Sequence, residues 1–181
     1  MSKPPSASPL LDEGEERLAA EDWDGAVAAF QKACTAAPSS ALAHSKLGVA
    51  YVHGQRWDDA HAAFTKAVQL DPRYAPAHSN LGNVYRERGR FDEAIACYQK
   101  AIAMDPDYWI AHQNLGVVYK QQGRIGEAVR EFKTATRLSL RAGARSPSTA
   151  ATGGRAGRMG CMGAGGMSVL LLVALATLVL H

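Results

Sequence analysis

"NLGNVYRERGRFDEA" (residues 80–94) decides the fold, because nearly the same letters return at a fixed distance in both directions. A glycine recurs every 34 residues, at Gly14, Gly48, Gly82 and Gly116. An alanine column (Ala26, Ala60, Ala94, Ala128) and an aromatic column (Phe30, Phe64, Tyr98, Phe132) share this period. Shorter columns of leucine, tyrosine and proline follow it too. A period of this length indicates copies of one small unit, stacked so that each buries its apolar face on the next.

Each unit has the spacing of two helices. Leu81 and Tyr85 lie four residues apart, which places them on one helical face. Gly89 then interrupts the pattern, and Ala94 and Tyr98 begin a second face with the same spacing. The pattern predicts two antiparallel helices joined by a short turn. An Asp-Pro pair at 71–72 and 105–106 closes the second helix, because proline disfavours helical geometry in the residue before it.

These columns resemble the tetratricopeptide repeat, whose signature is Leu-Gly-x-x-Tyr followed by alanine, an aromatic residue, alanine and proline at fixed offsets. The resemblance implies an all-α fold, a right-handed superhelical α-solenoid of four helix-turn-helix units. The repeat domain is placed at residues 7–140, with units at about 7–40, 41–74, 75–108 and 109–142. The end units depart from the signature, with Glu13 and Arg17 for leucine and tyrosine, and Leu140 for proline. Atypical end units are expected of a repeat array.

The charge distribution and the sequence motifs argue against two classes of function, nucleic-acid binding and catalysis. The formal net charge is +3, but the chain from residue 141 onward holds four arginines and no acidic residue. Residues 1–140 therefore hold the other 16 basic residues and all 17 acidic residues, a net charge of −1. A nearly neutral repeat region lacks the basic face that nucleic acid requires, so no nucleic-acid partner is expected. No Gly-rich phosphate loop, HExxH or GxSxG motif is present. The chain is therefore predicted not to be an enzyme, with no cofactor, no catalytic residues and no small-molecule substrate.

The resemblance further implies that the first helix of each unit lines a concave groove that binds a peptide or a partner helix. Carried over position by position, the predicted groove residues are Ser45, Lys46, Val49, Ser79, Asn80, Asn83, Arg86, Gln113, Asn114, Val117 and Lys120. Their hydroxyl and amide groups suit hydrogen bonding to a peptide main chain. Asn80 and Asn114 resemble the asparagine ladder in the repeats of O-linked N-acetylglucosamine transferase. The alternative is that both are ordinary solvated residues of an exposed helix face.

A second comparison argues against one class of partner. Repeat domains that capture the acidic tails of heat-shock chaperones use lysine, arginine and asparagine at set positions across three units. Placed on repeats two to four, those positions are occupied by Ser45, Val49, Asn80, Ile110 and Asn114. Only the residue at 80 fits, and the basic side chains that would hold two carboxylates are absent from the other positions. Chaperone-tail binding is therefore not expected.

Histidines and cysteines do not predict a metal site. His44, His78 and His112 form another column of 34-residue period. Equivalent positions on stacked units lie about 8–10 Å apart, whereas two imidazoles that share a zinc ion must each reach about 2 Å from it. These histidines are expected to pack or to line the groove edge. Cys34 and Cys97 stand alone, as small buried hydrophobes of a reducing compartment do.

The two ends differ from the repeats. Residues 1–9 are interpreted as a disordered lead-in without the apolar core of a targeting peptide. Residues 141–159 are predicted to be a flexible basic linker, and residues 160–181 a C-terminal hydrophobic helix. Its uncharged run at 167–180 spans about 21 Å as a helix, short of a hydrocarbon core of about 30 Å.

Four interpretations of the tail stay open. The favoured one is a membrane tail anchor with the arginines on the cytosolic side. A GPI-anchor signal would need an N-terminal secretory signal, which the sequence lacks. A helix that caps the last repeat would be apolar on one stripe, whereas this run is apolar all round. The fourth is that this end is not a natural feature of the protein.

The sequence therefore favours a scaffold or adaptor that binds an unidentified protein or peptide and is tethered at residues 160–181. It would face the cytosol on the mitochondrial outer membrane or the endoplasmic reticulum, or else be soluble in the cytoplasm. The alternative is a substrate-recognition arm of a glycosyltransferase system that acts with a catalytic partner in trans. Neither the partner, the membrane, the process nor the oligomeric state follows from the sequence.

Overall fold

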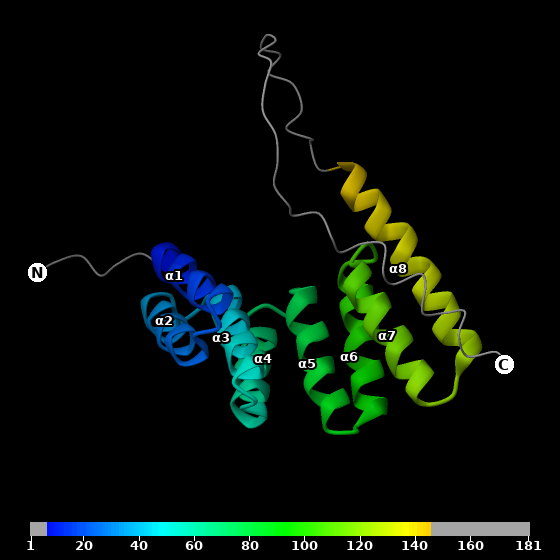
Figure 1. Cartoon of the computed structure of the whole chain (residues 1–181), viewed down its shortest axis with the longest axis horizontal. Coiled ribbons are helices and arrows are strands. Elements are labelled where there is room, and N and C mark those ends of the chain that lie inside the picture. The colour runs from blue at the N-terminus through cyan, green and yellow to red at the C-terminus, as the bar shows by residue number, and fades with distance from the viewer. Residues whose placement is uncertain (1–6, 146–181) are drawn as a thin grey trace, which may run out of the picture. The chain divides into compact units, whose positions relative to one another are not determined.

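The computed structural model describes residues 7–145, and within this range the chain forms eight α-helices and no strand (Figure 1). This confirms the predicted all-α class. The helices are α1 (Ala7–Ala19), α2 (Trp23–Ala36), α3 (Ala41–His53), α4 (Trp57–Leu70), α5 (Ala75–Glu87), α6 (Phe91–Met104), α7 (Trp109–Gln121) and α8 (Ile125–Arg145).

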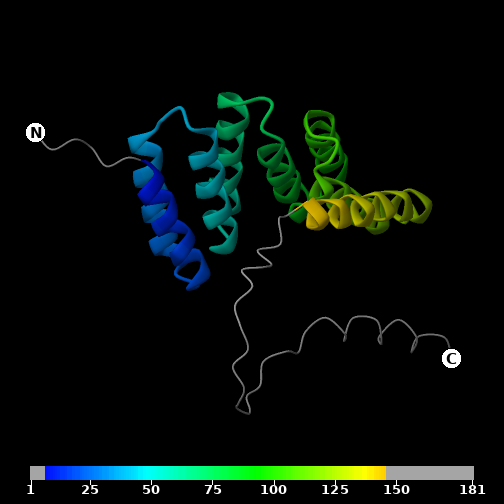
Figure 2. The same ribbon diagram turned by 90° about the horizontal axis from the view of Figure 1, so that it is seen from above.

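The eight helices pack as four pairs, α1·α2, α3·α4, α5·α6 and α7·α8, and the second helix of each pair packs on the first helix of the next (Figure 2). The first helices also contact one another, in the pairs α1·α3, α3·α5 and α5·α7. Among residues 7–145, no two second helices make such a contact. The first helices therefore lie closer together than the second helices, which makes their side the inner, concave side of the stack.

The glycine column allows the two helices of each pair to approach. A Cβ atom added to Gly82 would lie 2.7 Å from Cε1 of Tyr98, and one added to Gly48 would lie 2.5 Å from Cε1 of Phe64. Real Cβ atoms essentially never come this close, so the aromatic ring fills the space that glycine leaves. Tyr98 and Phe64 are fully buried as a result.

The turns inside the pairs use a fixed backbone conformation. Gly89 and Gly123 have φ of 71° and 74°, in the left-handed region that glycine adopts without strain. The equivalent residues of the first two pairs, Glu21 and Gln55, take the same region with φ of 59° and 57°. The turn geometry is therefore a property of the repeat, and only the last two units use the residue that suits it best.

A stacked Tyr-Arg pair, absent from the sequence-based predictions, closes three of the four turns. The guanidinium carbon lies over the tyrosine ring at 4.6 Å for Arg56 on Tyr51 and at 4.2 Å for Arg124 on Tyr119. Arg90 lies over Tyr85 in the same way at 4.8 Å. In the first unit the tyrosine and arginine positions hold Arg17 and Asp22, which form an ion pair of 2.7 Å instead.

The predicted end boundaries need correction. Helix α1 begins at Ala7, so residues 7–9 belong to the repeats and not to the lead-in. Helix α8 continues to Arg145, so residues 141–145 are not linker. Because Leu140 stands where other units have proline, nothing in the sequence stops this helix.

The rest of the predicted linker and the tail at 160–181 lie outside the described residues. The helices of residues 7–145 include none that is both long and apolar enough to cross a membrane.

Candidate peptide-binding groove

Helices α3, α5 and α7 place one repeat position three times on the inner side of the stack. This position holds Lys46, Asn80 and Asn114, all partly exposed. Because α3 contacts α5 and α5 contacts α7, the three side chains stand on neighbouring helices. The structure thus brings together the two asparagines that the sequence singled out, next to a lysine.

The preceding repeat position is buried in two units. Ser45 is only 4% exposed and Ser79 is fully buried, so both side chains are covered in the described part of the chain. Ser45 and Ser79 lie beside Tyr74 and Tyr108 respectively. Each tyrosine directly precedes the first helix of the following unit, and burial raises its pKa. The two buried serines therefore lie where one repeat meets the next.

Gln113 occupies the same position in the last unit and is exposed. It borders a hollow of about 220 Å³ between α7 and α8, together with Trp109 and Ser139. No described repeat follows to cover it, which explains why serine is replaced by a longer amide that suits water. Gln113 therefore faces the end of the described stack.

The asparagines differ in how much of their hydrogen-bonding capacity is free. Asn83 accepts a 2.7 Å hydrogen bond from the Tyr98 hydroxyl through its Oδ1, so this side chain braces α6 against α5 and keeps its amide donors. Asn114 donates a long bond of 3.5 Å from Nδ2 to Ser79 Oγ. Asn80 has no side-chain hydrogen bond to any residue of 7–145. A peptide would thus find the amides of Asn80 and Asn114 largely available.

The charges of the groove are mostly paired. Lys46 Nζ lies 2.7 Å from Glu15 Oε1, across α3 and α1. Arg86 Nη2 lies 2.7 Å from Oε1 of its neighbour Glu87. Lys120 is exposed and forms no ion pair within the described part of the chain. The groove is therefore polar but nearly neutral, and among residues 7–145 Lys120 leaves a cation without an ion pair at the α7 end.

Two valines form the floor between the polar side chains. Val49 is partly buried and packs against the core cluster that includes Leu47 and Tyr51. Val117 is partly buried in the same way on α7. Such half-buried valines offer a small apolar contact between the polar side chains.

The histidine column has a structural role. Nε2 of His44, His78 and His112 donates to the carbonyl oxygen of the proline six residues earlier, at 3.2, 2.9 and 3.4 Å. Each imidazole thus ties a first helix to the loop before it. No group of three or more metal-ligating side chains occurs in residues 7–145.

The two cysteines of the described region are free and shielded. Burial raises the pKa of the Cys34 thiol to about 11, and it raises the pKa of Cys97 as well. Both side chains therefore stay protonated at neutral pH and act as packing residues.

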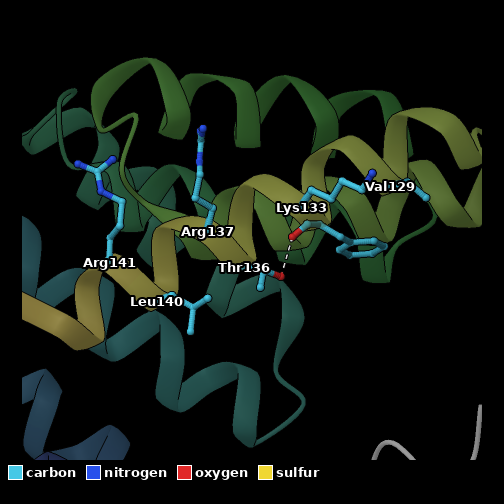
Figure 3. A pocket seen from close by; sticks show the side chains of 7 residues that line it. Val129, Lys133, Thr136, Arg137, Leu140 and Arg141 are labelled. Carbon is cyan, nitrogen blue, oxygen red and sulfur yellow. Dashed lines mark hydrogen bonds between the residues drawn. The ribbon is translucent and has the colours of Figure 1, made fainter.

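A second surface was missed by the sequence-based analysis. One face of α8 borders a hollow of about 680 Å³, lined by Val129, Phe132, Lys133, Thr136, Arg137, Leu140 and Arg141 (Figure 3). Arg137 and Arg141 extend to one side of the helix, and Thr136 and Leu140 to the other. The signal was available, because these residues recur at three- and four-residue intervals.

The repeat region matches known protein families. Profiles described as tetratricopeptide repeat match residues 11–75, 54–99 and 111–140, and a profile described as TPR repeat matches 82–123. No curated protein matches the chain.

Several solved structures are similar. A crystal structure of MamA is 30% identical with a TM-score of 0.65, over 76% of this chain and 81% of that one. Pseudomonas aeruginosa pilF is 26% identical with a TM-score of 0.68, over 74% of this chain and 61% of that one. The first repeat domain of Spaghetti (RPAP3), bound to an HSP90 peptide, shares the fold at 20% identity and a TM-score of 0.62, over 67% and 96%.

Proposed function

Because the chain belongs to the tetratricopeptide repeat family, we propose that residues 7–145 form a non-catalytic protein-interaction scaffold whose concave groove binds an extended peptide. The observation that carries this proposal is the pair of available amides on neighbouring inner helices, Asn80 on α5 and Asn114 on α7. A partner helix is the alternative occupant, and it would use the valines of the floor more than the amides.

The spacing of the amides suits an extended main chain. Equivalent positions on packed helices lie about 8–10 Å apart. Three residues of an extended peptide advance about 10 Å. Asn80 and Asn114 can therefore each pair with main-chain groups of the same peptide, three residues apart. Recognition of this kind depends on the backbone and tolerates varied side chains.

The charges limit the choice of peptide. Lys46 and Arg86 are already paired with Glu15 and Glu87, so binding two carboxylates there would mean breaking two ion pairs. A chaperone tail with adjacent carboxylates is therefore not the expected ligand. Lys120 favours one acidic side chain at the α7 end of the peptide.

The membrane tether is a second part of the proposal. We infer that residues 160–181 anchor the scaffold in an intracellular membrane, the mitochondrial outer membrane or the endoplasmic reticulum, with the repeats in the cytosol. The uncharged run at 167–180, preceded by arginines, supports this. Deletion of residues 160–181 is expected to release the protein into the soluble fraction. A full-length chain already soluble after carbonate extraction would contradict the tether.

A recognition arm for a glycosyltransferase acting in trans stays a prediction from the asparagine column alone. Its distinguishing result would be co-purification of the chain with transferase activity. Membrane retention without such activity would favour the adaptor.

The groove is tested with peptides selected from a random displayed library on the full chain. For one selected peptide, the double variant Asn80→Ala/Asn114→Ala is expected to weaken binding by about tenfold or more, since two main-chain hydrogen bonds of about 1 kcal/mol each are lost. Kd is measured by fluorescence anisotropy, and the melting temperature by circular dichroism. The melting temperature is expected to stay nearly unchanged, because Asn80 has no partner among residues 7–145 and the Asn114 bond is long.

The matched control is Gln99→Ala, which removes an exposed amide from the second helix α6. It is expected to leave Kd unchanged. If the control weakens binding as much as the double variant, or if the double variant unfolds the protein, the asparagines do not form the recognition site.

A further inference from the structure

The open face of α8 carries a row of apolar side chains. Ile125, Val129 and Leu140 are 56%, 43% and 69% exposed, with the partly exposed Phe132 among them. The hydroxyl of the exposed Thr136 donates to the carbonyl oxygen of Phe132, so its methyl group continues the row. These five residues recur at three- and four-residue intervals, and we name them the α8 stripe. Exposed apolar side chains in a continuous row on one helix indicate a surface that another molecule covers.

The inner repeats show which kind of element covers this face. Position by position, the first four residues of the α8 stripe correspond to residues of α6, namely Phe91, Ile95, Tyr98 and Ile102. All four belong to one core cluster with Leu115 and Tyr119 of α7, the first helix of the following unit. Helix α6 therefore receives a helix on this face. On α8 no helix of residues 7–145 takes that place, because α8 contacts only α7, its partner in the pair.

Basic side chains follow one edge of the α8 stripe. Lys133, Arg137 and Arg141 are exposed, line the hollow beside the stripe and form no ion pair among residues 7–145 (Figure 3). Glu127 and Glu131 of α8 do not offset them, because each is already paired, with the loop before α8 and with α7 respectively. No acidic residue lines the hollow. A partner that covers the stripe therefore gains from acidic side chains along this edge.

This charge belongs to α8 and not to the repeat. On α6 the three positions of the basic edge hold Gln99, Ala103 and Asp107. Near the start of α6, Asp92 accepts a 3.3 Å hydrogen bond from Nε2 of Gln122, which follows α7. The equivalent position on α8 is Gly126. Inside the stack the acid lies on the second helix, whereas on α8 it has to come from the partner.

We propose that the α8 stripe binds an amphipathic helix of a partner protein, whose apolar row lies on the stripe and whose acidic residues face Lys133, Arg137 and Arg141. From Ile125 to Leu140, α8 rises about 22 Å, so the partner helix needs about 15 residues. This second site goes beyond the concave groove, which the first helices form, and it does not depend on whether the groove binds a peptide.

A second copy of this chain fits the α8 stripe less well. In a symmetric pair of α8 faces, the two basic edges would meet each other. In a head-to-tail stack, α1 of the next copy would lie on the stripe, where Glu13 and Arg17 take the positions of Leu115 and Tyr119. The Glu13–Arg17 ion pair would then be taken out of water and placed against apolar side chains, which is costly.

A lipid surface also fits less well, because the α8 stripe is not flat. The stripe lies between two hollows, one of about 680 Å³ and one of about 220 Å³, and Phe132 and Thr136 line both. The side chains of a packed helix enter hollows on both sides of such a row. A flat lipid surface would leave the hollows unfilled.

The first test is a selection on the full chain. The probe is a displayed library of helical peptides of about 18 residues, long enough to cover the stripe. Leucine recurs in them at three- and four-residue intervals, and the other positions are random among glutamate, lysine and glutamine. Selection is expected to enrich glutamate over lysine. Selected peptides without an excess of glutamate, or a selection that yields no binder, would overturn the proposal.

The second test locates the binding site of one selected peptide, with Kd measured by fluorescence anisotropy. Leu140→Asp and the double variant Lys133→Glu/Arg137→Glu are each expected to raise Kd by about tenfold or more. All three side chains are exposed, so the melting temperature is expected to stay nearly unchanged. Equal Kd values for the wild-type chain and both variants would overturn the proposal.

Matched controls change the same kinds of residue elsewhere. Leu42→Asp alters a leucine that is 42% exposed on α3, and Lys66→Glu/Lys100→Glu reverses two exposed charges on α4 and α6. Both controls are expected to leave Kd unchanged. A control that raises Kd as much as its α8 counterpart would show that the peptide does not bind at the α8 stripe.

Three further results would assign the peptide or the stripe differently and overturn the proposal. Loss of binding in Asn80→Ala/Asn114→Ala would place the selected helix in the groove. Self-association in analytical ultracentrifugation that Leu140→Asp abolishes would assign the stripe to a second copy. Flotation with phosphatidylserine vesicles that both α8 variants abolish would assign it to lipid. Leu140→Asp is expected to leave Kd of a groove peptide unchanged, so failure of this proposal and failure of the groove are distinguishable.

Discussion

The two ends of the described stack are built differently. Where α3 carries Leu47 and Tyr51 against the preceding unit, α1 carries Glu13 and Arg17, which form an ion pair of 3.1 Å on an exposed face. At the other end, α8 retains exposed aliphatic residues, among them Leu140. The first end has a surface suited to water, and the second has a surface suited to another helix. The comparison teaches that a repeat position has no fixed environment, because the neighbouring unit supplies half of it.

The largest expected effect comes from exchanging residues between the interior and the first end. Tyr51 is buried, accepts a 3.0 Å bond from Gln31 Nε2 and lies under Arg56. Tyr51→Arg buries an unpaired charge and is expected to lower the free energy of unfolding by about 3 kcal/mol or more. The reverse change at the equivalent first-end position, Arg17→Tyr, loses only exposed ion pairs and is expected to cost less than about 1 kcal/mol. Urea unfolding followed by circular dichroism measures both, and equal losses would break the comparison.

A smaller effect is expected from two glycines of the same helical type. A Cβ at Gly82 would meet the ring of the fully buried Tyr98, whereas one at Gly126, near the start of α8, would meet nothing within 4 Å. Gly82→Ala is therefore expected to destabilise the protein by about 1–3 kcal/mol, and Gly126→Ala to stabilise it by about 0.5–1 kcal/mol. Urea unfolding followed by circular dichroism measures the free energy of unfolding of both variants. Tolerance of alanine at 82 would mean that the inner pairs are as loosely packed as the open side of α8.

The smallest expected effect is a loss of stability in acid at the first end of the stack, which α1 and α2 form. The pKa of Asp22 is lowered by the hydrogen bond from Gly25 N and by Arg17. Because its folded-state pKa lies below its unfolded-state value, the ionised group contributes stability above about pH 4 that is lost as the pH falls further. Asp22→Asn keeps an acceptor for Gly25 but removes the charge. Its melting temperature is expected to lie below that of the wild type at pH 7, and the gap is expected to close towards pH 2.

The control for this prediction is Glu16→Gln, which removes a charge from the same helix pair without breaking any ion pair of residues 7–145. A gap that is equal for both variants, or one that widens in acid, would mean that the Arg17–Asp22 pair does not stabilise the first end.

Much of the fold followed from the sequence because the repeat period is strict. The columns of Gly82 and Tyr98 gave the helix pairs and their contact, and the Asp-Pro pairs gave the ends of α4 and α6. The continuation of α8 past Leu140 was not predicted, because the change to a Gly-, Ala- and Ser-rich composition at 141 was interpreted as the start of a flexible linker.

The groove was predicted less well than the fold. Periodicity grouped Asn80 with Asn114, but it could not distinguish the buried Ser79 from the exposed Gln113 in the adjacent column. The bond from Tyr98 to Asn83 and the pairing of Lys46 with Glu15 each join residues of different helices, and a single column does not reveal such partners.

What the sequence determined by itself is the unit: two helices, a left-handed turn and a glycine beneath an aromatic ring, because these depend on contacts within 34 residues. What only the tertiary structure decided is exposure: which serine lies under a tyrosine of the next unit, which amides stay free, and which face of α8 is left open. The reason is that water is excluded by the neighbouring unit, so burial belongs to the stack and cannot be read from one repeat.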